Sequence, residues 1–254
     1  MAWCAKPYLG YARSDPEFTE NVLAINGFLN ERGYTLESQA GLIACMYHES
    51  GLNPWRWGGD YDGHEAMEGD PNQSAQGYGF FQFTPWGKYV DNQDAELLEG
   101  YAPNKSIHEI TEGADPSDGW AQMLFYDLIP GWVADMWRDY WYAGNPLCYE
   151  YGLEPLTDEE VAEYQGYRDD VIFRWGINGV VPKSEFKNMT YIEDAVWAFL
   201  SGYEGPLVPR YYGDACEFAR EVVWEILSSD TPPDPPDSMS SRKGMPLWMY
   251  LRRY

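Results

Sequence analysis

The stretch Ala40-Gly-Leu-Ile-Ala-Cys-Met-Tyr-His-Glu-Ser-Gly-Leu-Asn-Pro54, followed by Gly77-Tyr-Gly-Phe-Phe-Gln-Phe-Thr84, predicts the centre of the fold. Thr35 suits the N-cap of a helix. Apolar residues then recur at helical spacing through Met46 and Tyr47. Gly51 and the Asn-Pro pair at 53–54 end the pattern. The sequence therefore predicts a helix from Thr35 to Gly51.

Glu49 lies in the last turn of this helix. The negative end of the helix dipole and the unpaired carbonyl groups there disfavour a charged carboxylate. Burial among neighbouring apolar side chains would raise its pKa further; the candidates are Met46, Tyr47, Leu52, Trp55 and Trp57. A carboxyl that stays protonated near neutral pH suits a general acid acting on a glycosidic oxygen. The alternative is an ordinary exposed charge at a helix end.

Glu49-Ser50, followed by the Gly79-Phe-Phe-Gln82 run, resembles the Glu-Ser…Gly-x-x-Gln signature of the lysozyme-like superfamily, which includes goose-type lysozymes and soluble lytic transglycosylases. The resemblance is closer to the phage tail lysozyme family, and it extends over residues 15–228. Further matching segments are Gly33-Tyr-Thr35, Phe173-Arg-Trp-Gly176, Tyr203-Glu-Gly-Pro206 and Arg210.

This resemblance implies a mainly α, lysozyme-like single domain with a small β hairpin or sheet beside the active-site loop. It also implies cleavage of the bond between N-acetylmuramic acid and N-acetylglucosamine in bacterial peptidoglycan, with Glu49 as general acid. The enzyme would be a hydrolase or a lytic transglycosylase, located in the phage tail or in the host cytoplasm before release. The alternatives are a free endolysin and a virion structural or adhesion module without turnover.

The loop from Pro54 to Gln76 is rich in Gly, Asp, Asn and Glu. One interpretation is that this loop is exposed to solvent and its charges have no catalytic role. The other places a carboxylate opposite Glu49, where it would hold the attacking water of an inverting glycosidase, and Asp60 and Asp62 are the candidates. The spacing matches no EF-hand loop, and His48 lacks a second histidine four residues later. We therefore expect no metal and no cofactor.

In the second half of the motif, Gly77 and Gly79 allow close approach of the backbone to another segment or to a ligand. Alternation predicts that Phe81 and Phe83 face the core, with Phe80 and Gln82 on the opposite side.

The Gln82 side chain can donate and accept hydrogen bonds, which suits binding to the amide of an N-acetyl sugar or a structural hydrogen bond near Glu49. The resemblance implies that Gln82 lines the cleft. Aromatic faces also suit stacking against sugar rings. Tyr203 is a further candidate because the family's Tyr-Glu segment returns towards the catalytic helix, whereas Glu204 is alternatively a buried partner of an arginine. The predicted substrate contacts are Ser50, Trp55, Tyr78, Gly79, Gln82 and Tyr203.

The chain of 254 residues carries a formal net charge of −24. Such an acidic surface repels nucleic acid, so a nucleic-acid partner is not expected. The N-terminus shows no signal-peptide core, and the irregular spacing of Cys4, Cys45, Cys148 and Cys216 favours free buried thiols over disulfides.

Outside the motif, the sequence predicts helices after Pro16, across 120–142 with a break at Pro130-Gly131, after Thr157, and over 190–200 and 214–227. The predicted organisation is an N-terminal arm (1–14), the catalytic domain (15–228), a Pro-rich linker (229–241) and a basic aromatic tail (242–254). This tail suits docking to other virion tail proteins or to an anionic membrane surface, and the alternative is that it folds back on the acidic domain.

Deleting residues 238–254 is expected to leave turnover of soluble glycan intact and to abolish assembly into virions. Turnover assays on the truncated protein, together with immunodetection in purified particles, check this. Loss of soluble turnover would instead make the tail part of the active domain.

Overall fold

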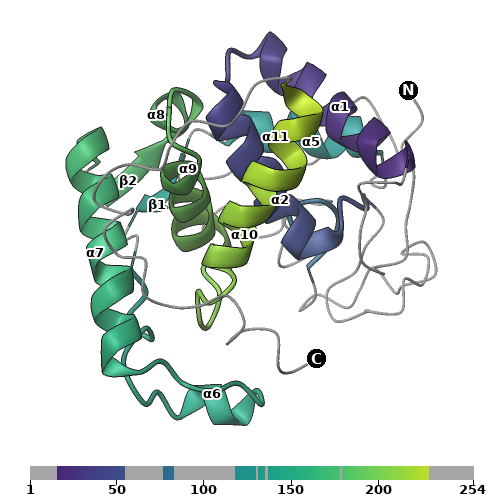
Figure 1. The fold of residues 1–254 in the computed structure, drawn as a ribbon. Helices are drawn as coiled ribbons and strands as arrows, with labels where there is room; N and C mark the ends of the chain where they lie inside the picture. Colours follow the sequence, from purple (N-terminus) through teal and green to yellow (C-terminus); the bar gives the residue numbers. More distant parts are fainter. Residues whose placement is uncertain are drawn as a thin grey trace.

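Helix α2 (Leu36–Ser50) lies at the centre of the described part of the chain, with other helices on several sides of it (Figure 1). The computed structural model describes residues 16–54, 77–82, 118–129, 131–134, 137–177 and 179–228. The remaining helices are α1 (Pro16–Glu31), α5 (Gly119–Leu128), α6 (Leu147–Glu150), α7 (Asp158–Trp175), α8 (Lys183–Lys187), α9 (Ile192–Ala198), η2 (Phe199–Glu204), α10 (Tyr212–Phe218), η3 (Ala219–Val223) and α11 (Trp224–Leu227).

The ends of α2 are those that the sequence predicts. The Thr35 side chain accepts a hydrogen bond from the Ser38 backbone N–H, and Gly51 closes the helix in the left-handed conformation, with its N–H donating to the Tyr47 carbonyl. Residues 38–46 are all buried, which explains why a helix with so few charges is stable here. None of the helices described is both long and apolar enough to cross a membrane.

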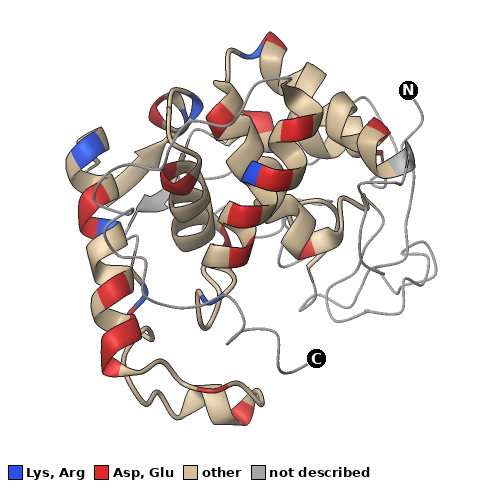
Figure 2. Ribbon diagram, in the orientation of Figure 1, with Lys and Arg blue, Asp and Glu red and all other residues tan. Residues whose placement is uncertain are grey.

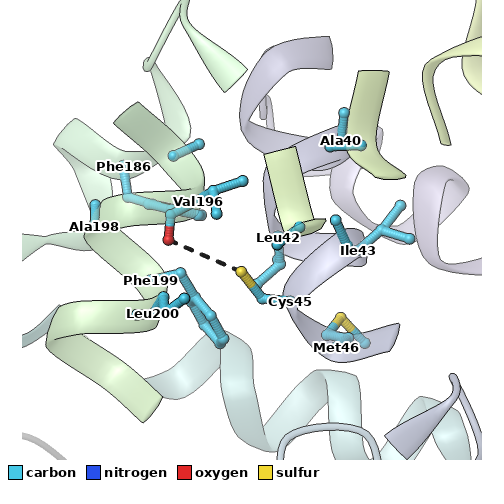
Figure 3. Close-up of a cluster of buried hydrophobic side chains, with 14 of the residues drawn as sticks. Ala40, Leu42, Ile43, Cys45, Met46, Phe186, Val196, Ala198, Phe199 and Leu200 are labelled. Atoms are coloured by element: carbon cyan, nitrogen blue, oxygen red, sulfur yellow. Dashed lines mark hydrogen bonds between the residues drawn. The ribbon is translucent and has the colours of Figure 1, made fainter. Parts of the chain in front are cut away.

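Helices α2 and α9 pack closely because Gly41 has no side chain. A Cβ atom at this position would lie 2.8 Å from the Cβ of Ala195 and 3.1 Å from the backbone nitrogen of Val196. Figure 3 shows the apolar cluster next to this contact, where Cys45 of α2 faces Val196 and Phe199. The Cys45 Sγ lies 3.9 Å from the Val196 carbonyl oxygen. The helix pair therefore forms a tightly packed part of the core.

The first predicted helix and those over 190–200 and 214–227 are present, and the last two continue as π-helical turns, η2 after α9 and η3 after α10. Thr157 caps α7 in a reciprocal capping box with Glu160. Of the four cysteines, Cys45, Cys148 and Cys216 are free and buried, as expected, and Cys4 lies outside the described residues.

The prediction of a second helix after Pro130-Gly131 is wrong, since residues 137–142 form turns and bends and not a helix. Residues 131–134 differ as well. They form strand β1 (Gly131–Ala134), which pairs antiparallel with β2 (Gly179–Pro182). The Trp132 indole is buried and donates to the Ala198 carbonyl oxygen at 2.9 Å. Pairing with a distant strand and burial of this indole outweigh the helical spacing. The mainly helical class with a small sheet is confirmed, although the two strands are too far apart in sequence to form a hairpin.

Partly buried ion pairs attach α7 to α9 and to the turn before α10. Asp194 of α9 is fully buried, and its carboxylate accepts from the Arg174 guanidinium at 2.6 Å and from the Trp175 indole at 2.6 Å. Arg210 binds Glu160 at 2.7 Å. Figure 2 shows acidic residues on most of the described helices and fewer basic ones, in keeping with the net charge.

Lys183 at the start of α8 is buried, with its ammonium group donating to the Tyr126 carbonyl oxygen and lying 4.5 Å from the centre of the Tyr126 ring. Burial lowers the pKa of Lys183 from 10.5 to about 7. Between these two values the unfolded chain binds a proton that the folded chain does not, so the free energy of unfolding rises with pH there and falls as pH drops to 7.

We expect Lys183→Met to stabilise the protein most at pH 7 and below. Its advantage over the wild type should shrink by about 2 kcal/mol between pH 7 and pH 9, at roughly 1.4 kcal/mol per pH unit. Urea denaturation at a series of pH values measures this difference. Arg168→Met, which removes a positive charge from a partly exposed site, is the control. Its free energy of unfolding should rise with pH between 7 and 9 as that of the wild type does. A constant difference between Lys183→Met and the wild type would contradict the assignment.

Candidate active site

Glu49 is half-buried in the last turn of α2. Its Oε1 atom accepts a hydrogen bond from the Tyr211 hydroxyl at 3.0 Å. Burial raises the pKa of the Glu49 carboxyl, and the hydrogen bond from Tyr211 opposes this rise. The direction agrees with the expectation from sequence, whereas Trp55 and Trp57, two of the expected neighbours, lie outside the described residues.

Tyr211 is a contact that sequence reasoning missed. It lies 162 residues after Glu49, in the turn before α10, and no motif marks it. The His48 ring stacks on the Tyr211 ring with centroids 5.3 Å apart, and the neighbouring Arg210 is held by Glu160. Burial lowers the pKa of His48 to about 4, so the imidazole is neutral at pH 7. The stacking of His48 on the Tyr211 ring and the ion pair of the adjacent Arg210 therefore both fix the turn that carries the Tyr211 hydroxyl.

Glu204 at the end of η2 is a second carboxyl beside Glu49. Its Oε1 atom is buried and has no hydrogen-bond partner. Burial and the neighbouring Glu49 carboxylate raise the pKa of Glu204 well above its ordinary value. The alternative of an arginine partner is not supported, since no ion pair within the described ranges includes Glu204; the Arg138 guanidinium instead donates to the Gly202 carbonyl oxygen at 2.7 Å.

Ser50 connects the end of α2 to the turn at residues 77–82. Its hydroxyl is fully buried, donates to the Met46 carbonyl oxygen at 2.8 Å and lies 3.2 Å from the Phe80 carbonyl oxygen. The side chain that the motif marked as a substrate contact thus makes structural bonds here.

Gln122 of α5 joins the same two segments, and sequence reasoning missed it as well. Its Oε1 atom accepts from the Phe80 N–H at 2.8 Å, and its Nε2 atom donates to the Pro54 carbonyl oxygen at 2.6 Å. Gly79 adopts a φ of +75°, and a Cβ atom there would lie 2.3 Å from the Gln122 side chain, so glycine is required at this position.

The described part of the Gly77–Thr84 segment is a turn in which Phe80 and Phe81 are both buried, so the alternating pattern is wrong for Phe80. A turn has no two-residue periodicity, which explains the difference. Gln82 is half-buried at a φ of 45°, and its side-chain amide donates to the Gly79 carbonyl oxygen at 3.0 Å. Tyr78 is buried.

Tyr203 packs against aromatic rings of the core and feels the charges of both carboxyls. Its ring stacks on Phe199 at a centroid distance of 4.6 Å and meets Phe81 edge-on at 6.1 Å. Burial, followed by the charges of Glu204 and Glu49, raises the pKa of its hydroxyl well above the ordinary value. The fold thus brings Tyr203 close to Glu49.

Of the remaining predicted site residues, Trp55, Asp60 and Asp62 lie outside the described residues. Within the described ranges, no group of three or more His, Cys, Asp or Glu side chains is arranged to hold a metal ion.

Comparison with known proteins places this geometry in context. Residues 20–118 match the family model described as phage tail lysozyme, a segment that includes Glu49 and Gln82. Morphogenesis protein 1 of Bacillus phage B103 is 26% identical over 107 residues, which cover 42% of this chain and 27% of that protein. The chain thus matches about a quarter of the length of that relative. The match confirms the resemblance to the phage tail lysozyme family over residues 20–118.

Proposed function

We propose that this protein cleaves the bond between N-acetylmuramic acid and N-acetylglucosamine in peptidoglycan, with Glu49 as the general acid. The observation that carries this proposal is the environment of Glu49, a carboxyl at the end of a buried helix with a raised pKa. A raised pKa increases the fraction of protonated acid near neutral pH, which proton donation to a glycosidic oxygen requires.

The hydrogen bond from Tyr211 supports one orientation of the acid. Because Oε1 accepts from the Tyr211 hydroxyl, Oε2 is the oxygen that carries the proton. That proton passes to the glycosidic oxygen as the bond to the anomeric carbon breaks, and the bonding electron pair leaves with this oxygen. Ser50 and Gln122 hold the 77–82 turn against the end of α2, which supports a role for nearby Gln82 in binding an N-acetyl group.

The second step defines the enzyme class, and we propose hydrolysis. An acidic residue of the 55–76 loop, Asp60 or Asp62, would hold the attacking water. Lytic transglycosylation is the alternative; there the muramoyl 6-hydroxyl attacks the anomeric carbon, and one glutamate serves as acid and then as base.

We further propose that the enzyme acts from the phage tail on the cell wall during genome entry. The description of the matching family names the tail, and the relative from phage B103 is named as a morphogenesis protein. A basic aromatic C-terminal segment after a Pro-rich linker suits attachment to other tail proteins. Release as a free endolysin and a structural module without turnover are the competing functions.

We expect Glu49→Gln to reduce clearing of purified peptidoglycan by at least about 100-fold, because general acid catalysis commonly contributes 10²–10⁴. Glu37→Gln, at the opposite end of the same helix, is the matched control and should retain wild-type activity. Turbidity of wall suspensions gives the rate, and circular dichroism checks that both variants fold. Equal clearing by Glu49→Gln and the wild type would remove the proposed acid; no clearing by either on a range of walls would favour the structural module.

Mass spectrometry of the released muropeptides distinguishes attack by water from attack by the muramoyl 6-hydroxyl. We expect N-acetylmuramic acid with a reducing end, because water is the proposed nucleophile. A 1,6-anhydro end, which is lighter by one water molecule, would identify a transglycosylase. In that case the hydrolytic role of the 55–76 loop would be wrong, while the role of Glu49 would stand.

A further inference from the structure

Tyr211 lies at the end of the 205–211 segment, which connects η2 to α10. The residues of this segment form no helix or strand, so no regular ladder of backbone hydrogen bonds fixes their position. The Tyr211 hydroxyl nevertheless meets the proposed acid, donating to Glu49 Oε1 at 3.0 Å. Side chains from the 138–160 region bind the segment at both of its ends.

Three of these side chains hold the beginning of the segment. The Tyr140 hydroxyl donates to the Gly205 carbonyl oxygen at 2.5 Å, and the Trp141 indole donates to the Pro206 carbonyl oxygen at 2.7 Å. The Arg138 guanidinium packs so closely against Gly205 that a Cβ atom there would lie 2.5 Å from its Nη2 atom. These contacts fix where the chain leaves η2.

Arg210 fixes the end of the segment, directly before Tyr211 in the chain. Its Nε and Nη2 atoms donate to the two carboxylate oxygens of Glu160 at 2.7 and 2.9 Å. The same guanidinium donates to the carbonyl oxygens of Glu154 and Pro155. Glu160 is buried and is held at the start of α7 by its capping box. A bidentate pair of this kind fixes both the position and the plane of the guanidinium.

We propose that Arg210 is a positioning residue for the acid, because its ion pair with Glu160 holds the adjacent Tyr211 hydroxyl at hydrogen-bond distance from Glu49. Tyr211 orients the Glu49 carboxyl, and Arg210 acts on the acid only through Tyr211. This inference rests on the proposed function, in which Glu49 is the general acid. Arg210 lies outside residues 20–118, the segment that matches the family model.

The alternative is that Arg210 acts on Glu49 through its charge. The pKa of Glu49 is raised by burial and lowered by the Tyr211 hydrogen bond, and Arg210 is not among these causes. Burial keeps the described titratable groups near Glu49 uncharged at neutral pH, by raising the pKa of the acidic groups and lowering that of the imidazole to about 4: Cys45 and His48 of α2, Tyr203 and Glu204 of η2, and Tyr211.

Two more ionisable groups adjoin this set, Arg138 beside Gly205 and Asp214 beside His48, and every variant below leaves both in place. A change in the titration of Glu49 therefore reports the substituted residue.

The pH dependence of kcat/KM on soluble peptidoglycan fragments tests the proposal, because its high-pH limb reports loss of the proton from the acid. Tyr211→Phe removes a hydrogen bond that lowers the pKa of Glu49, so this limb should move to higher pH. Its kcat should fall about 10-fold, as expected for loss of a hydrogen bond to a charged group. We expect Arg210→Gln to move the limb in the same direction and to reduce kcat by a similar factor, with little change in KM. Arg220→Gln, which breaks an ion pair of similar burial with Glu193, is the matched control and should leave the limb and kcat unchanged.

Two further variants distinguish position from charge. Arg210→Gln combined with Tyr211→Phe should behave as Tyr211→Phe alone, because both substitutions remove the same hydrogen bond. Additive effects would show that Arg210 acts independently of Tyr211 and would overturn the proposal. Arg210→Lys keeps the positive charge and loses the bidentate fork, so it should still move the limb. A limb that moves in Arg210→Gln but not in Arg210→Lys would assign the effect to charge, with the same consequence.

A second measurement follows the acid without turnover. Protein labelled with ¹³C at the glutamate carboxyl is titrated by NMR, with the Glu49 signal assigned from the spectrum of Glu49→Gln. The Glu49 midpoint should rise in Tyr211→Phe and in Arg210→Gln and stay in place in Arg220→Gln. If Arg210→Gln does not fold, Arg210→Met combined with Glu160→Met replaces it, since that pair of substitutions leaves no unpaired buried carboxylate. An unchanged Glu49 midpoint in the variant that folds would overturn the role of Arg210.

These measurements separate this inference from the proposed function. A protein without turnover that shows the expected shifts of the Glu49 midpoint would keep the positioning of Glu49 by Arg210 and lose the proposed function. If Glu49→Gln abolishes turnover while Arg210→Gln leaves kcat and the high-pH limb unchanged, the function stands and the role of Arg210 is overturned.

Discussion

The close packing of α2 against α9 is the constraint on which the proposed site depends. Because Gly41 lacks a Cβ atom, the Ala195 side chain and the Val196 backbone of α9 occupy the space that a side chain at position 41 would need. Helix α9 runs on into η2, so its position determines where Glu204 lies relative to Glu49. A bulkier residue at position 41 would separate the helices and with them the two carboxyls.

Within the described ranges, the arginines that form ion pairs do so with other carboxylates than Glu49 and Glu204. Several arginines of the described chain bind acidic side chains outside the site: Arg174 binds Asp194, Arg210 binds Glu160 and Arg220 binds Glu193. These pairs join α7, the turn before α10 and η3 to their neighbours. Burial raises the pKa of Glu49 and of Glu204, whereas hydrogen bonds from Arg210 and Thr157 outweigh burial and lower the pKa of Glu160.

The hydrogen bonds around the 77–82 turn connect the site to the rest of the core. Gln122 from α5 binds the Pro54 carbonyl oxygen and the Phe80 N–H, and Ser50 of α2 contacts the Phe80 carbonyl oxygen. The motif residues thus divide by role. Ser50 and Gly79 position the backbone, and Glu49 presents a titratable group.

Local features of the sequence were sufficient for α2, because its caps at Thr35 and Gly51 and its apolar spacing act within the helix itself. The raised pKa of Glu49 was also predictable in direction, since the helix terminus and its apolar neighbours are adjacent in sequence. The same local reasoning failed at residues 131–134, where pairing with residues 179–182 overrides helical spacing. Tyr211 became recognisable only in three dimensions, because its hydrogen bond to Glu49 depends on helix packing between segments far apart in the chain, which no short-range pattern encodes.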